Sequence, residues 1–96
     1  MLMLNKKLQI IAQGCHHDPA FIVGDSQGLT ALRNAIEIAL GKGEACVNNA
    51  FTTDGEGFDI IIACREDMGD VPLGYTMESA KDNMTLPEWL IKLAYP

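Results

Sequence analysis

The sequence has few aromatic residues and lacks any long hydrophobic run. Only 6% of its 96 residues are aromatic, whereas 48% are hydrophobic, a share that argues against disorder. No apolar run approaches the roughly 18 to 20 residues that a membrane span needs. The stretch Leu8 to Ala12 is interrupted by Gln9 and falls short of the roughly 7 to 15 residues of an export signal. We therefore expect a soluble protein that is not exported.

Cysteine is scarce as well, with three residues at wide spacing. An odd, scattered set argues against a disulfide framework and favours a reducing cytoplasm. The run Cys15-His16-His17-Asp18 contains residue types used in nucleophilic and metal sites, but sequence neighbours rarely reach the required geometry. We expect an ordinary surface turn there, with no metal, no cofactor and no catalytic residue. A small enzyme using Cys15 with His16 or His17 is the less favoured alternative.

Basic residues are rare in the second half of the chain. Residues 1–50 carry four basic and four acidic residues, whereas residues 51–96 carry three basic against nine acidic, so the net charge of -6 lies in the second half. This distribution makes direct nucleic-acid binding improbable and favours a partner with a basic surface. The alternative is that the acidic residues only keep a small protein in solution.

What the chain does contain is a clear α+β pattern from Phe21 to Gly41. A β-prone run is followed by Asp25 or Ser26 as a helix N-cap, and Gly41-Lys42-Gly43 ends the helix. The large apolar residues of the helix recur at near-helical spacing and predict its buried face. They are Leu29, Leu32, Ile36 and Leu40.

Two hairpins are predicted on either side of this helix. Leu8 to Ala12 pairs with Ala20 to Val23, and Ala45 to Thr53 pairs with Phe58 to Arg65 around the turn Asp54-Gly55-Glu56-Gly57. In the second hairpin, we expect residues whose numbers sum to about 111 to lie opposite each other. One face of the hairpin then carries Val47, Phe51, Phe58, Ile60, Ile62 and Cys64. The expected fold is a single α+β domain over residues 1–96, with a mainly antiparallel sheet (β-β-α-β-β) covered on one face by the long helix.

The remaining residues form a long acidic loop, 66–84, and a short C-terminal element. Thr85-Leu86-Pro87-Glu88 is a capping box that favours a helix over residues 86–95, although Trp89, Ile91, Leu93 and Tyr95 also alternate like a strand. Trp89 is expected in the core. Because a chain of this length buries only roughly 60 to 70% of its extended surface, a partner or a homodimer would add stability.

The block from Phe21 to Arg65 resembles the small immunity proteins of bacterial polymorphic toxin systems. The resemblance lies in Gly24-Asp25, Gly28-Leu29 and the helix that follows. It implies a small cytoplasmic protein that binds a cognate toxin domain and blocks its active site, with no catalysis of its own. We expect the toxin domain to present a basic active-site cleft to the acidic half of this chain.

Acidic and large adaptable side chains in the hairpin turn and the long loop are the predicted partner-binding residues. They are Asp54, Glu56, Glu66, Asp67, Asp70, Tyr75, Met77 and Glu78. A small-ligand-binding or regulatory α+β module is the main alternative, because the same architecture hosts many functions. Such a module would need an enclosed pocket with convergent polar groups, whereas an enzyme would need an accessible, activated Cys15.

Overall fold

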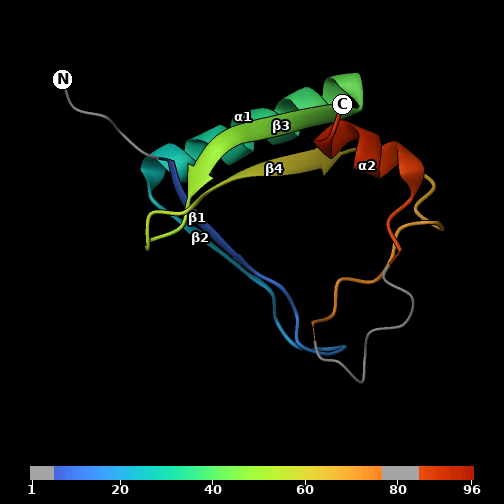
Figure 1. The fold of residues 1–96 in the computed structure, drawn as a ribbon, viewed down its shortest axis with the longest axis horizontal. Coiled ribbons are helices and arrows are strands. Elements are labelled where there is room, and N and C mark those ends of the chain that lie inside the picture. The colour runs from blue at the N-terminus through green and yellow to red at the C-terminus, as the bar shows by residue number, and fades with distance from the viewer. Residues whose placement is uncertain (1–5, 77–84) are drawn as a thin grey trace. The chain divides into compact units, whose positions relative to one another are not determined.

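The computed structural model describes residues 6–76 and 85–96 and shows an α+β protein (Figure 1). Its elements in chain order are β1 (Lys6–Ile11), β2 (Phe21–Gly24), α1 (Ser26–Lys42), β3 (Glu44–Phe51), β4 (Gly57–Ala63) and α2 (Glu88–Ala94). No helix in this part of the chain is long and apolar enough to cross a membrane.

The chain divides into two compact units, which we describe separately. The first contains residues 6–9 and 22–64, and therefore α1, β3 and β4. The second contains residues 10–21, 65–76 and 85–96 of the described chain, and therefore α2.

The sheet is mixed, with the strand order β2-β1-β3-β4. β3 and β4 form the predicted antiparallel pair, but β1 runs parallel to β3, with Lys6 opposite Ala50 and Lys7 opposite Phe51. The prediction of a mainly antiparallel sheet needs this correction, because α1 carries the chain back across the sheet before β3 begins. Patterns within each hairpin do not reveal which strands of the two hairpins become neighbours.

Both ends of α1 are stabilised by the residues that the sequence indicates. At the start, Asp25 Oδ1 accepts a hydrogen bond from the Gly28 backbone N–H at 2.7 Å. At the end, Gly43 adopts a left-handed conformation, with φ of 96°, and its N–H donates to the Ala39 carbonyl. The predicted cap and glycine stop are confirmed.

The buried face of α1 differs from the predicted one. Its buried residues are Gly28, Ala35 and Ala39, whereas Leu40 is 70% exposed and Leu29 and Ile36 are each 43% exposed. A Cβ atom on Gly28 would lie 2.2 Å from the Lys7 carbonyl oxygen, so α1 approaches β1 very closely there. Because this approach leaves room only for small side chains beneath the helix, the larger residues turn to its flank.

The core of the first unit is small and lies where α1 covers β3 and β4 (Figure 1). Leu8, Ala35, Val47 and Ala50 form its buried cluster, and several half-buried residues pack around it. Those residues are Ala31, Leu32, Ala45, Phe58, Ile60 and Ile62.

A β-bulge interrupts the pairing of β3 with β4. Val47 lies opposite Ile60, but the next pair is Ala50 with Phe58, so two residues of β3 face one residue of β4. Asn49 has a φ of 58°, and its N–H donates to Asp59 Oδ1 at 3.0 Å. The bulge reverses the faces of β3, so that Ala50, not Phe51, is fully buried. The predicted register was therefore wrong, and Cys64 is exposed instead of facing the core.

In the second unit, α2 confirms the helical interpretation of the C-terminal segment. The helix begins at Glu88, after Pro87 as the N-cap residue, and no side chain caps it. The capping box predicted from Thr85 therefore does not form. Glu88 and Lys92 make an exposed ion pair of 3.2 Å along the helix. Trp89 is half buried.

Candidate functional site

The two predicted acidic residues of the β3–β4 turn, Asp54 and Glu56, are both exposed. Asp54 is engaged in the turn itself, because its carboxylate accepts hydrogen bonds from the Thr52 hydroxyl and the Glu56 N–H. Thr52 and Glu56 also join through their backbones, and Gly55 has a φ of 90°. The Thr52 hydroxyl, followed by the Glu56 N–H, lowers the pKa of Asp54 below its ordinary value. The turn therefore presents a fixed negative charge.

We expect Thr52→Ala to raise the pKa of Asp54 toward the ordinary carboxyl value of about 3.9, because the main hydrogen bond to the carboxylate is lost. In the parent protein this hydrogen bond stabilises the folded state at pH values above the ordinary pKa of an aspartate. The stabilisation is lost as the pH falls through the lowered pKa of Asp54. A carboxyl-carbon NMR titration measures the change. Thr53→Ala is the control, since the Thr53 hydroxyl donates to Gln9. An unchanged Asp54 pKa in Thr52→Ala would contradict this assignment.

In the second unit, the segment after β4 is anchored to α2 through Trp89. The Arg65 guanidinium lies 3.8 Å from the centroid of the indole ring, a cation–π contact. The Trp89 Nε1–H donates to Asp70 Oδ2 at 2.9 Å. Asp70 is therefore both an exposed acid and a tether of the loop.

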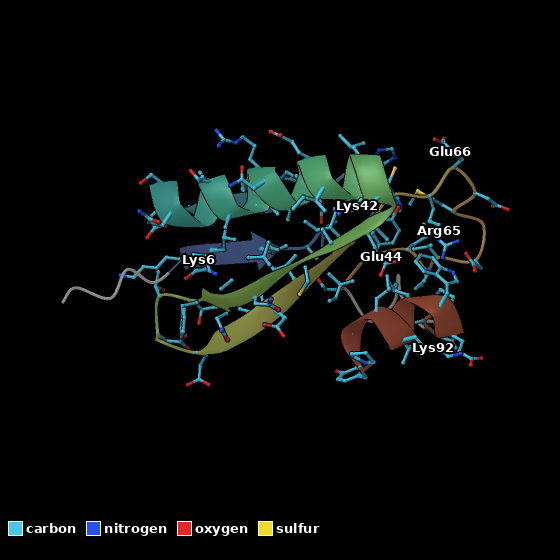
Figure 2. All side chains as sticks on the ribbon, turned by 90° about the horizontal axis from the view of Figure 1, so that it is seen from above. Lys6, Lys42, Glu44, Arg65, Glu66 and Lys92 are labelled. Atoms are coloured by element: carbon cyan, nitrogen blue, oxygen red, sulfur yellow. The ribbon has the colours of Figure 1, made fainter. Side chains whose placement is uncertain are left out.

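Glu66 and Asp67 lie between these two tethers and are exposed. Asp67 Oδ1 accepts the Gly69 N–H at 2.9 Å, which shapes the following turn. The Glu66 carboxylate makes no hydrogen bond or ion pair to any residue that the structure describes. In Figure 2, Arg65 and Glu66 are labelled on this loop, and Lys92 is labelled on α2. Like the carboxylate of Glu56, which contributes only backbone atoms to its turn, the Glu66 carboxylate is open to a partner.

The loop has a second anchor near Tyr75. The Thr76 N–H and hydroxyl both donate to the Gln13 carbonyl, at 2.9 and 3.2 Å. The Tyr75 ring is half buried and lies edge-on to His16, with ring centroids 6.5 Å apart. Tyr75 is therefore a partly packed ring near the end of the described part of the loop. The predicted residues Met77 and Glu78 lie outside the described residues.

The run Cys15-His16-His17-Asp18 forms a compact turn. Asp18 Oδ2 accepts the Cys15 N–H, and the Asp18 N–H donates back to the Cys15 carbonyl. The two histidine rings are T-shaped, with centroids 4.8 Å apart, and His17 has a φ of 70°. Within residues 6–76 and 85–96, no group of three or more His, Cys, Asp or Glu side chains is placed to hold a metal ion. The Asp18 carboxylate therefore stabilises the backbone of the turn through its hydrogen bond with Cys15.

Cys46 belongs to the first unit, on the exposed side of β3. Its thiol donates to Asn48 Oδ1 at 3.1 Å. Desolvation, followed by the negative charge of Asp59, raises the pKa of Cys46 above the ordinary thiol value. A thiol with a raised pKa has less thiolate at neutral pH, so Cys46 is a poor candidate nucleophile.

The first unit also contains a cavity of about 300 Å³, which is near the lower limit for small-ligand sites. Its lining residues are Lys7, Leu8, Gln9, Val23, Gly24, Asp25 and Thr53. Two of its polar groups are already engaged, because Asp25 caps α1 and Gln9 Oε1 accepts from Thr53. Lys7 is the one basic residue of this lining and Asp25 the one acidic residue.

Sequence patterns did not indicate the tethers of the acidic loop. Asp70 and Trp89 are 19 residues apart, and Gln13 and Thr76 are 63 residues apart. No local periodicity links such residues, since the contacts depend on the tertiary structure. Comparison with known proteins gives no match to this chain among family models, curated proteins or solved structures.

Proposed function

We propose that this chain is an inhibitory binding protein of the immunity type, which binds a cognate bacterial toxin domain and blocks its active site without catalysis of its own. The observation that carries the proposal is the anchoring of the acidic loop. Contacts of Trp89 with Arg65 and Asp70, and of Thr76 with Gln13, hold the segment 65–76 in place. A surface that is ordered before binding loses less conformational entropy when a partner arrives.

The charge of this surface indicates the kind of partner. Five of the predicted binding residues are exposed carboxylates, and they belong to the half of the chain that carries the net charge of -6. They are Asp54, Glu56, Glu66, Asp67 and Asp70. A basic active-site cleft, such as that of a nuclease or nucleotide-binding toxin, would be attracted to such a surface. Tyr75, in the same segment as Glu66, Asp67 and Asp70, would supply an apolar anchor.

Binding kinetics with the product of the adjacent gene test this proposal. We expect Glu56→Lys with Glu66→Lys to slow association about tenfold at low salt, and less at high salt, because long-range attraction is lost. Tyr75→Ala should mainly speed dissociation, by about 30-fold if Tyr75 is a hot spot worth about 2 kcal/mol. Glu44→Lys, which changes an exposed acid on β3, is the charge-matched control for Glu66→Lys alone.

Three outcomes would count against the proposal. The adjacent gene product does not bind, or a complex forms that neither change weakens, or Glu44→Lys slows association as much as Glu66→Lys alone. In the last case the effect reports only net charge and not the acidic loop.

The cavity of the first unit favours a second candidate function, a small-ligand or regulatory module. Lys7 beside an apolar lining would suit a small anionic ligand with an apolar part. Ligand-induced NMR shifts confined to Lys7, Val23 and Thr53 would favour this function over inhibition. The cavity is small and its other polar groups are engaged, so inhibition remains the better supported proposal.

A further inference from the structure

An exposed apolar stripe runs along one flank of α1 in the first unit. Leu29, Arg33, Ile36 and Leu40 follow one another at spacings of four, three and four residues, which places them on one side of a helix. The three apolar members are 43 to 70% exposed. Beside them, Arg33 and Glu37 form a loose exposed pair, with 4.0 Å between Nε and Oε1. The stripe therefore leaves a large part of its apolar side chains exposed.

The stripe is complementary to itself. If a second α1 packs against it in the antiparallel direction, about a two-fold axis near residue 35, Leu29 meets Leu40 of the second copy. The same arrangement places Ile36 near the axis and brings Arg33 close to Glu37 of the second copy. Apolar residues therefore meet apolar residues, and each positive charge meets a negative one. An unrelated partner would not require this symmetry.

We propose that this flank of α1 is an interface between two copies of the chain. The proposal does not rest on toxin binding, which we assign to the acidic surface. The apolar surface extends beyond the helix, because Leu29 lies 3.4 Å from the position that a Cβ on Gly24 would take, at the end of β2. There Ile22, which shares the sheet face of position 24, is 56% exposed, and β2 is an edge strand.

The area of this surface predicts a weak dimer. A fully exposed Leu or Ile side chain offers about 60 to 120 Å² of apolar area, so four half-exposed side chains offer about 120 to 240 Å² in each copy. Because interfaces are a little over half apolar, the dimer would bury about 400 to 850 Å² in total. This is below the size of stable interfaces, so the association should depend on concentration.

Sedimentation velocity on the full chain measures the association. The sample contains a reducing agent, since Cys46 and Cys64 are exposed and could crosslink. Between about 5 μM and 1 mM we expect a shift from 10.4 kDa toward twice that mass. Leu40→Glu should weaken the dimer at least about tenfold. Ile38→Glu is the matched control, because Ile38 is 50% exposed but lies on the opposite flank of α1.

A charge swap tests the symmetry itself. Arg33→Glu should weaken the dimer by placing two acids opposite each other, and adding Glu37→Arg should restore it. Circular dichroism checks that each variant is folded. The proposal is overturned if the parent protein stays monomeric at about 1 mM, if Ile38→Glu dissociates the dimer as strongly as Leu40→Glu, or if the swap fails to restore association. If the protein is monomeric but still binds a toxin domain, the proposed dimer is wrong and the proposed inhibitory function is unaffected.

Discussion

Gly28→Ala should lower the melting temperature of the protein, whereas Gly41→Ala should raise it. In an ordinary helix either change is favourable by up to about 1 kcal/mol, because alanine restricts the unfolded chain and favours helix. A Cβ at position 28, however, would lie 2.2 Å from the Lys7 carbonyl oxygen and 2.9 Å from Leu8 Cγ. Position 41 has no atom within 4 Å of a Cβ. The two changes therefore have opposite signs.

The penalty at Gly28 is large because the obstacle is backbone. The Lys7 carbonyl belongs to β1, which pairs with β3, and it also accepts the Asp25 N–H. It moves only if α1 and β1 separate. Overpacking of this kind costs about 1 to 3 kcal/mol, which in a domain of this size lowers Tm by roughly 5 to 20 °C. Thermal unfolding of both variants measures the difference. A Gly28→Ala protein as stable as Gly41→Ala would show that α1 does not approach β1 so closely.

Ala35→Asp should unfold the first unit, whereas Leu40→Asp should leave it folded. Ala35 is 4% exposed against the core cluster, so an aspartate there would be a buried charge without a partner. Its cost is several kcal/mol, comparable to the whole stability of a small domain of about 5 to 15 kcal/mol. Leu40 is 70% exposed, and a charge there stays in water.

This pair of variants reverses what hydrophobicity alone suggests, because leucine is usually the core residue and alanine the tolerant one. Circular dichroism melts at low protein concentration decide the matter, since dilution removes any contribution from dimer formation. If Leu40→Asp unfolds the protein and Ala35→Asp does not, the buried face of α1 is the one that periodicity predicted.

The sequence predicts best those features that are set by neighbouring residues. The cap at Asp25 and the stop at Gly43 use short-range backbone hydrogen bonds, and both appear in the structure. The turn between β3 and β4 is likewise determined locally by Gly55 and its neighbours. The α+β class follows from these elements.

Features that depend on how close two elements approach were not predictable. The large residues Leu29, Ile36 and Leu40 suggested the buried face of α1, but the glycine and alanines that permit close packing occupy it instead. The register of β3 depended on a single left-handed residue, Asn49, which alternation of apolar residues does not reveal. The parallel pairing of β1 with β3 depended on the path of α1.

The acidic residues of the candidate site were found from composition, because charge lies on the surface wherever the chain folds. Their roles were not predictable. The carboxylate of Asp54 accepts a hydrogen bond from Thr52, and that of Asp70 accepts one from Trp89. These hydrogen bonds fix the positions of the two negative charges. The carboxylates of Glu56 and Glu66 have no such contact among the described residues, which makes both suitable positions for charge reversal.

Trp89 is the only tryptophan in the chain, and its two described interactions, with Arg65 and Asp70, lie within the second unit. Its indole is stacked by Arg65 and hydrogen-bonded to Asp70, so its fluorescence emission depends on whether the acidic loop is attached to α2. The far-ultraviolet signal of the 17-residue helix α1 follows the first unit instead. The protein therefore carries an intrinsic optical label for its acidic surface, and the two units can be followed separately during unfolding or titration without any added dye.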